Sequence, residues 1–149
     1  MKFNVQDHAL TQLVYTCTAS YEFDKDDLLA LLQKCKTYNS LHDITGLLLY
    51  FEGSFLQVLE GDNATIQHLY ETISKDPRQS SIFLLYEKPI TRRDFAQWSM
   101  GFHALTQDEI NAEPALSHFF DPKFQFNEMD NHQLKALLNA VRRINISHH

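Results

Sequence analysis

The feature that most constrains the fold is the apolar segment LLLYFEGSFLQVLEG, which occupies residues 47–61. Its two arms flank Glu52-Gly53, a pair typical of the tight turn between two antiparallel strands. The segment therefore predicts a β-hairpin, and its second arm carries an amide, Gln57, among apolar neighbours. Because an amide buried without partners costs about 1–3 kcal/mol, Gln57 requires an edge position, a structural hydrogen bond to backbone, or a ligand.

Three other segments have the composition of strands. Residues 11–18 (TQLVYTCT) are β-branched and apolar without a charge, which predicts a buried strand. Residues 81–90 (SIFLLYEKPI) predict a fourth strand of the sheet, and residues 97–105 (QWSMGFHAL) predict a fifth.

Two segments have the spacing of amphipathic helices. Apolar residues recur at helical spacing over residues 25–38, and Asp24 offers an N-cap. A second helix is expected to start at Asp62 or Asn63 and to stop at Asp76-Pro77. Its apolar face consists of Ile66, Leu69, Tyr70 and Ile73.

The resulting order is strand, helix, strand, strand, helix, strand, strand. This order predicts an α+β fold, namely a ferredoxin-like, mainly antiparallel sheet with two helices on one face. The other face needs cover, and C-terminal helices packed on or near it are expected to supply this cover. A capping-box pattern at Thr106 and Glu109 and an apolar stripe from Leu134 to Val141 support such helices. The expected division is an N-terminal extension over 1–10, a core domain over 11–105, a helical appendage over 106–147 and a tail at 148–149.

Composition excludes several classes of function. The 149 residues carry a formal net charge of −6 and no basic run, which argues against direct binding of nucleic acid. The longest apolar stretches fall short of the roughly 20 residues of a membrane helix, and the N-terminus lacks a secretory signal. No contact with a membrane is expected, and a cytoplasmic location is the default. Spacings typical of metal ligands, phosphate loops and nucleophile elbows are absent, so no metal is expected.

A few polar residues in apolar surroundings remain. If Tyr15 and Gln57 both face the two helices, a flat ring held between those helices contacts both, and Asn39 closes the pocket from the side. Each residue also has an ordinary structural explanation. Tyr15 is then a buried phenol bonded to a carbonyl, Asn39 a helix terminator, and Trp98 and Met100 core residues.

Three segments resemble the signature segments of BLUF domains, a family of flavin-binding blue-light receptors. They are LVYTCTAS, YNSLHDITGLLLYFEGSFLQVLEG and FAQWSMGF, in the order and spacing of the family, from about residue 11 to 104. The resemblance is to the short, single-domain type. It implies FAD as the cofactor, with FMN or riboflavin as alternatives.

The resemblance also implies roles for single residues around the ring. Tyr15 resembles the family's electron donor, and Gln57 resembles the glutamine that bridges this tyrosine to the flavin. Asn39 resembles the asparagine that hydrogen-bonds the ring carbonyls, and Tyr38 is expected to flank the ring.

Four further positions are assigned in the same way. Asp76 and Arg78 match a loop in which polar contacts to the flavin side chain are expected. Trp98 and Met100 resemble the aromatic and thioether pair whose strand communicates the switch.

The mechanism implied is photochemical, without enzymatic turnover. Tyr15 donates an electron to the excited flavin, a proton follows through Gln57, and the return transfer leaves Gln57 rotated or tautomerised with a slight red shift. Since no effector domain fits in the remaining residues, the signal is expected to pass to a downstream protein partner or to change self-association. Two alternatives stay open: a ferredoxin-like small hydrolase and a ligand-free protein-interaction module.

Overall fold

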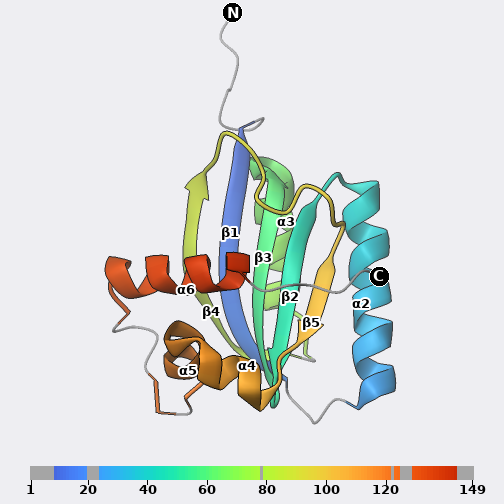
Figure 1. The fold of residues 1–149 in the computed structure, drawn as a ribbon. Coiled ribbons are helices and arrows are strands. Elements are labelled where there is room, and N and C mark those ends of the chain that lie inside the picture. The colour runs from blue at the N-terminus through green and yellow to red at the C-terminus, as the bar shows by residue number, and fades with distance from the viewer. Residues whose placement is uncertain (1–8, 20–23, 78, 122, 125–128, 144–149) are drawn as a thin grey trace, which may run out of the picture.

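The computed structural model describes residues 9–19, 24–77, 79–121, 123–124 and 129–143. Within this part of the chain, five strands form one sheet (Figure 1). They are β1 (Leu10–Ala19), β2 (Thr45–Phe51), β3 (Ser54–Asp62), β4 (Gln79–Pro89) and β5 (Gly101–Ala104). The spatial order is β4-β1-β3-β2-β5, with all neighbours antiparallel except β2 and β5, which are parallel.

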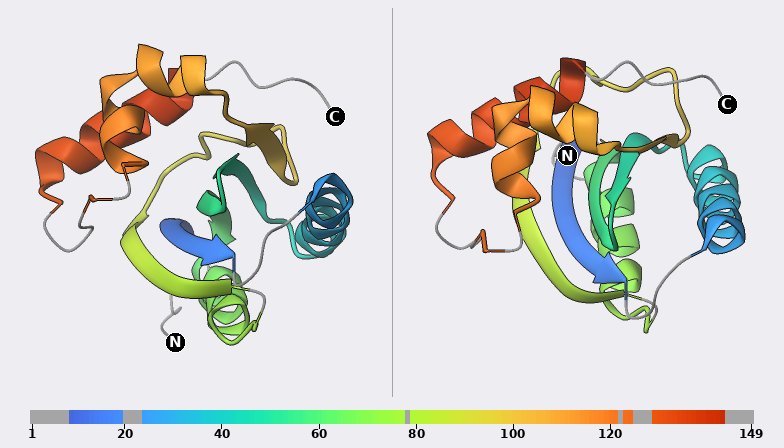
Figure 2. Two further views of the ribbon diagram at one scale, coloured as in Figure 1. Left: turned by 90° about the horizontal axis from the view of Figure 1, so that it is seen from below. Right: turned by 60° about the horizontal axis from the view of Figure 1, so that its bottom comes forward.

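Helices cover both faces of this sheet (Figure 2). Side chains of α2 (Lys25–Leu41) and α3 (Asn63–Ser74) share an apolar core with one face, which we call the α2/α3 face. The other face, the α6 face, is covered by α4 (Gln107–Ala112), α5 (Pro114–Phe119) and α6 (Asn131–Arg143). The predicted ferredoxin-like α+β fold with C-terminal helices on the second face is thereby confirmed.

The hairpin turns at the predicted pair. Glu52 and Gly53 have φ angles of 47° and 86°, as in the two-residue turn that requires φ > 0 at both positions. This turn pairs Leu48 with Gln57 and Phe51 with Ser54. The register therefore follows from local turn chemistry.

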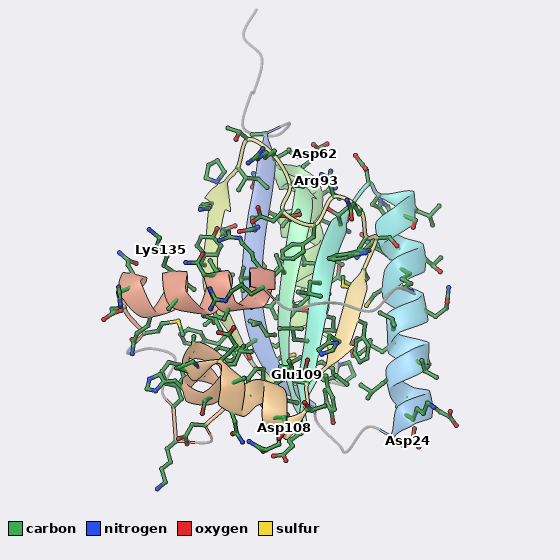
Figure 3. All side chains as sticks on the ribbon, in the orientation of Figure 1. Asp24, Asp62, Arg93, Asp108, Glu109 and Lys135 are labelled. Atoms are coloured by element: carbon green, nitrogen blue, oxygen red, sulfur yellow. The ribbon has the colours of Figure 1, made fainter. Side chains whose placement is uncertain are left out.

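Helix starts follow the capping patterns with one difference. The Asp24 carboxylate accepts from the backbone N–H of Asp27 at the start of α2 (Figure 3), and Thr106 with Glu109 forms the predicted capping box of α4. Asp62 occupies the N-cap position of α3, but its side chain makes no capping hydrogen bond. None of the helices among the described residues is both long and apolar enough to cross a membrane.

The fifth strand is shorter than predicted. It begins at Gly101 and not at Gln97, because the segment from Ile90 to Met100 forms a loop without a continuous ladder of strand hydrogen bonds. The backbone N–H of Gly46 donates to the carbonyl of Trp98 at 3.1 Å, where β2 begins. This loop, residues 90–100, carries two of the predicted site residues.

Side chains alternate along the central strands and form two separate cores. The core of the α2/α3 face includes Leu13, Tyr15, Leu31, Leu48, Phe55, Leu59, Ile66 and Met100. The core of the α6 face includes Val14, Leu49, Leu56, Val58, Phe95, Ile110, Leu116, Leu137 and Val141.

Candidate functional site

Tyr15 and Gln57 are directly opposite each other on β1 and β3, and both point toward the α2/α3 face. The Tyr15 hydroxyl donates a hydrogen bond to Oε1 of Gln57. Tyr15 is 1% and Gln57 is 5% exposed, so this bond is shielded from water. The two residues that the sequence singled out are thus one hydrogen-bonded pair.

The Tyr15 phenol is held in its neutral form. Burial is the main cause that raises the pKa of Tyr15 well above its ordinary value of 10.0, and nearby acidic groups, among them the Asp76 carboxylate, act in the same direction. A neutral phenol is a hydrogen-bond donor, which fits its bond to the amide oxygen of Gln57. The tyrosine therefore carries a proton that it can release toward a defined acceptor.

The other end of the Gln57 amide is held weakly. Its Nε2 lies 3.6 Å from Sδ of Met100, and a thioether is a weak acceptor. A primary amide has two donors and two acceptor lone pairs. Gln57 therefore retains hydrogen-bonding capacity toward a ligand, which argues against a purely structural role for this amide.

Asn39 lies near the C-terminal end of α2 and is 2% exposed. Its Nδ2 donates to the carbonyl of Ser99 at 2.7 Å. Its own backbone carbonyl accepts from the N–H of Ile44 at 2.9 Å, just after the end of the helix. α2 nevertheless continues to Leu41 with His42 as its C-cap, so Asn39 is not the helix terminator that the sequence offered as an alternative. Its side chain instead links α2 to the loop over residues 90–100.

These residues surround a cavity of about 140 Å³ between α2, α3 and the sheet. From α2 it is lined by Leu31, Lys34, Cys35, Tyr38 and Asn39; from α3 and the turn after it by Leu69, Thr72, Ile73 and Asp76; and from the strands by Tyr15 and Gln57. The cavity is thus lined by two amides and two phenols, together with apolar side chains of the helices. Sequence analysis indicated these amides and phenols and Asp76, whereas Lys34 and Thr72 carry no signal in the sequence that points to a cavity.

The donor set fits a flavin. The edge of an isoalloxazine ring alternates carbonyl oxygens with ring nitrogens, and primary amides offer partners to both. The volume is below the roughly 300 Å³ at which ligand pockets usually begin, so a bound ring requires the side chains of α2 and α3 to move apart. Asn39, Gln57 and Tyr15 would hold the ring, and the apolar residues of the helices would cover its flat faces.

Two other predicted contacts lie at the rim. Tyr38 lines the cavity, and its ring packs on that of His42 with centroids 4.1 Å apart. Asp76 lines the cavity just after α3. Arg78, predicted to contact the flavin side chain, lies outside the described residues.

Trp98 and Met100 do not share a face as the fifth-strand prediction required. Met100 is 1% exposed in the core of the α2/α3 face, whereas Trp98 packs against the core of the α6 face. The Trp98 ring stacks on Phe95 with centroids 6.2 Å apart. The prediction was wrong because strand alternation does not apply to a loop, and β5 starts only at Gly101.

A larger cavity, of about 510 Å³, lies where β1, the hairpin turn and α5 meet. Its wall includes Phe51, Phe119 and Phe120, but neither member of the Tyr15–Gln57 pair. The described wall carries no side-chain amide, so the smaller cavity is the chemically competent one.

Comparisons with known proteins identify the family of the chain. The family model described as sensors of blue light using FAD (BLUF) matches residues 10–101, well over half of the chain. The photoactivated adenylate cyclase subunit beta of Euglena longa is 35% identical over 111 residues, which cover 74% of this chain and 13% of that protein. The chain therefore spans only a small part of the length of this relative.

Two solved structures are similar over nearly the whole chain. BlsA in its photo-activated state has 25% identity and a TM-score of 0.76, covering 94% of this chain and 99% of that chain. BlrB, described as a BLUF protein in its dark state, has 26% identity and a TM-score of 0.74, covering 91% and 97%. With the family match, the shared fold and a flavin-compatible site in agreement, the chain belongs to the BLUF family of flavin-based blue-light sensors.

Proposed function

We propose that Tyr15 and Gln57 are the light-switchable pair of this sensor and that its cofactor is FAD. The observation that supports the pair is the chain of contacts from the Tyr15 hydroxyl through the Gln57 amide to Sδ of Met100, beside the cavity. Asn39 and Tyr38 would hold the ring. FMN or riboflavin would satisfy the same ring contacts, so the choice of FAD rests on the family.

The contacts to the rest of the cofactor belong to the same proposal. Asp76, at the rim of the cavity, would bind polar groups of the flavin side chain. Arg78 would complement the negative charge of the phosphates, because a guanidinium pairs well with them.

Bound flavin supplies the absorption of blue light and an excited state that accepts an electron. Tyr15 would donate that electron, and its hydroxyl proton would move along the existing hydrogen bond to Gln57. When the electron and a proton have both returned to Tyr15, the Gln57 amide would be left in a second bonding pattern, rotated or tautomerised. Its contact with Sδ of Met100 is then lost or altered, and the loop over residues 90–100 receives the change.

The output is proposed to be a change in protein–protein contact, with no turnover by the chain itself. In the cyclase relatives, whose names attribute photoactivation to an adenylate cyclase, the matched part is a small share of the protein. We infer that residues 11–105 form the sensor and residues 106–147 its output appendage, which acts on a partner protein or a second copy. A cytoplasmic location stays a prediction from the sequence.

Absorption spectroscopy of the purified protein tests this function. We expect flavin bands in the blue that shift slightly to the red on illumination and return in darkness. Tyr15→Phe is expected to bind flavin without a red shift. Tyr70→Phe is the matched control. The ring of Tyr70 lies edge-on to that of Tyr15, with centroids 5.5 Å apart, and removal of the Tyr70 hydroxyl leaves the bond between Tyr15 and Gln57 in place.

Other outcomes reject the proposal. A normal red shift in Tyr15→Phe removes Tyr15 as the donor. A colourless protein with hydrolase activity would support the small-hydrolase alternative, and a colourless inert one the interaction module. Extraction of the cofactor followed by chromatography distinguishes FAD from FMN and riboflavin.

A further inference from the structure

A buried carboxylate lies on β3, on the opposite face from Gln57. Glu60 is 0% exposed, although it is an acidic residue. Its carboxylate accepts from Nε2 of Gln12 at 2.8 Å, from the backbone N–H groups of Asp94 and Phe95 at 2.8 and 2.9 Å, and from Oγ1 of Thr45 at 3.4 Å. A carboxylate that accepts two backbone N–H groups fixes the position of that backbone.

The backbone fixed by Glu60 is the loop that carries the switch contact. Asp94 and Phe95 precede Trp98, whose N–H donates to the Phe95 carbonyl at 3.2 Å. Two residues further, Met100 meets Gln57. The loop over residues 90–100 is therefore held by β3 at two points: at its middle by Glu60 on the α6 face, and at its end by Gln57 on the α2/α3 face.

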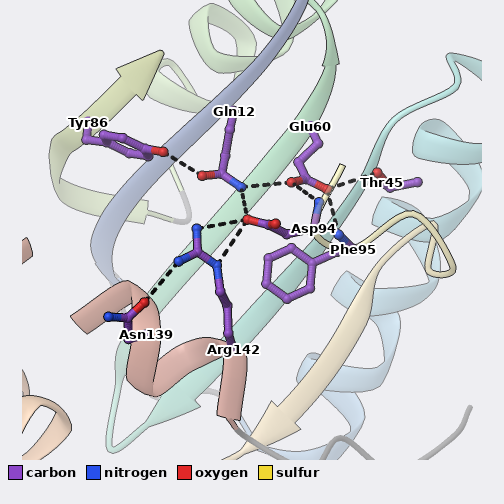
Figure 4. A network of polar contacts seen from close by, with 8 residues as sticks. All are labelled: Gln12, Thr45, Glu60, Tyr86, Asp94, Phe95, Asn139 and Arg142. Carbon is purple, nitrogen blue, oxygen red and sulfur yellow. Dashed lines mark hydrogen bonds and ion pairs between the residues drawn. The ribbon is translucent and has the colours of Figure 1, made fainter. Parts of the chain in front are cut away.

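The same loop is joined to the C-terminal helix by an ion pair. Nε and Nη2 of Arg142, in the last turn of α6, lie 3.1 and 2.9 Å from Oδ2 of Asp94 (Figure 4). The same oxygen accepts from Nε2 of Gln12 at 3.0 Å, and the Tyr86 hydroxyl donates to the Gln12 amide oxygen at 2.6 Å. Gln12, Glu60, Asp94 and Arg142, which we call the coupling network, thus connect β1, β3, the loop and α6.

Apolar packing supports the same link. Phe95, adjacent to Asp94, is 6% exposed and belongs to the core of the α6 face together with Leu137 and Val141 of α6. A shift of the loop therefore acts on α6 through one charged contact and one apolar core.

We propose that the Asp94–Arg142 ion pair couples the light switch to α6, so that loss of the Gln57–Met100 contact changes the docking of α6. This inference rests on the proposed function and names the route by which that function reaches the C-terminal helix. An ion pair of this partly exposed kind shifts an equilibrium by roughly two- to fivefold. An ion pair of this strength can keep α6 docked in one state of the switch and can be broken in the other.

Hydrogen exchange on the full-length, flavin-loaded protein tests the route. We expect illumination to change the amide exchange of both the loop over residues 90–100 and α6. In Arg142→Gln, the loop should still respond, while the light-induced change in α6 should fall by about two- to fivefold. Arg143→Gln is the matched control, because Arg143 pairs with Glu113 at 2.8 Å, next to α5, and should leave both responses intact.

The absorption red shift is read on the same samples. A normal red shift with an unchanged α6 response in Arg142→Gln overturns the coupling alone, as does an equal loss in Arg142→Gln and Arg143→Gln. A parent protein whose α6 does not respond despite a normal red shift also overturns it. Absence of the red shift in the parent overturns the proposed function, and the coupling with it.

Discussion

β3 presents different polar chemistry to the two faces of the sheet. On the α2/α3 face, Gln57 has one hydrogen bond to a phenol and one weak contact to a thioether, beside a cavity. On the α6 face, Glu60 accepts four hydrogen bonds within a packed core. One strand therefore carries both a group able to change partners and a group whose partners are fixed.

Replacing a buried glutamine by leucine on each face should give the largest difference in the light-induced red shift. Gln57→Leu is expected to keep flavin bound and to abolish the red shift completely, because the switching amide is gone. Gln12→Leu, which removes a buried amide from the α6 face, is expected to keep the red shift and lose stability. Absorption difference spectra of both variants check this; a red shift in Gln57→Leu, or its loss in Gln12→Leu, would erase the distinction.

Removing the fixed carboxylate should cost the most stability. Glu60→Leu leaves the backbone N–H groups of Asp94 and Phe95 without their acceptor. At about 1–3 kcal/mol for each unsatisfied buried group, we expect a loss of roughly 2–6 kcal/mol in the free energy of unfolding. Urea unfolding measures this loss. Glu71→Leu removes an exposed carboxylate paired with Lys75 and should cost less than about 1 kcal/mol; equal losses would refute the prediction.

The loop offers a smaller contrast between its two signalling positions. Met100→Leu conserves volume but removes the thioether acceptor of Gln57, so the rate of dark recovery should change by roughly two- to fivefold. Trp98→Phe should alter this rate less, because Trp98 packs on the α6 face. Flash photolysis compares the two rates, and a larger effect of Trp98→Phe would contradict the assignment of faces.

The smallest expected effect is that of low pH on α6, through the carboxylate of Asp94. Burial tends to raise the pKa of Asp94, but hydrogen bonds from Gln12 and Arg142 and nearby positive charge lower it below its ordinary value of 3.8. A lowered carboxyl pKa contributes stability that is present above the unfolded value and is lost as pH falls through the folded value. We therefore expect α6 to gain amide exchange only below about pH 4. Asp94→Asn should remove this step; a step near neutral pH would point to another group.

Sequence reasoning predicted the α2/α3 face better than the α6 face. Tyr15 and Gln57 were singled out because a polar residue in an apolar strand stands out against its neighbours, and Asn39 was assigned through the family resemblance. The placement of Trp98 failed because an apolar segment without a turn signal has the composition of a strand, whether or not a strand partner is available. Only the tertiary hydrogen bonds of the loop decide this.

The coupling network could not be predicted from periodicity. Glu60 follows an apolar run and precedes Gly61, a context in which an acidic residue is ordinarily exposed at a strand end. Its burial depends on Gln12 and on backbone N–H groups of a loop more than thirty residues later in the chain. One signal was available: strand alternation places Glu60 on the same face as Leu56 and Val58, which are both buried.

The turn at Glu52 and Gly53 has a consequence for how this protein tolerates change. Because side chains alternate along a strand, a one-residue slip of β3 would move Gln57 to the packed core of the α6 face and turn Glu60 toward the cavity. Most surface connections of a domain accept insertions and deletions. The turn at Glu52 and Gly53 is predicted to accept neither. A change of one residue in its length would exchange the side chains of β3 that face α2 and α3 with those that face α6.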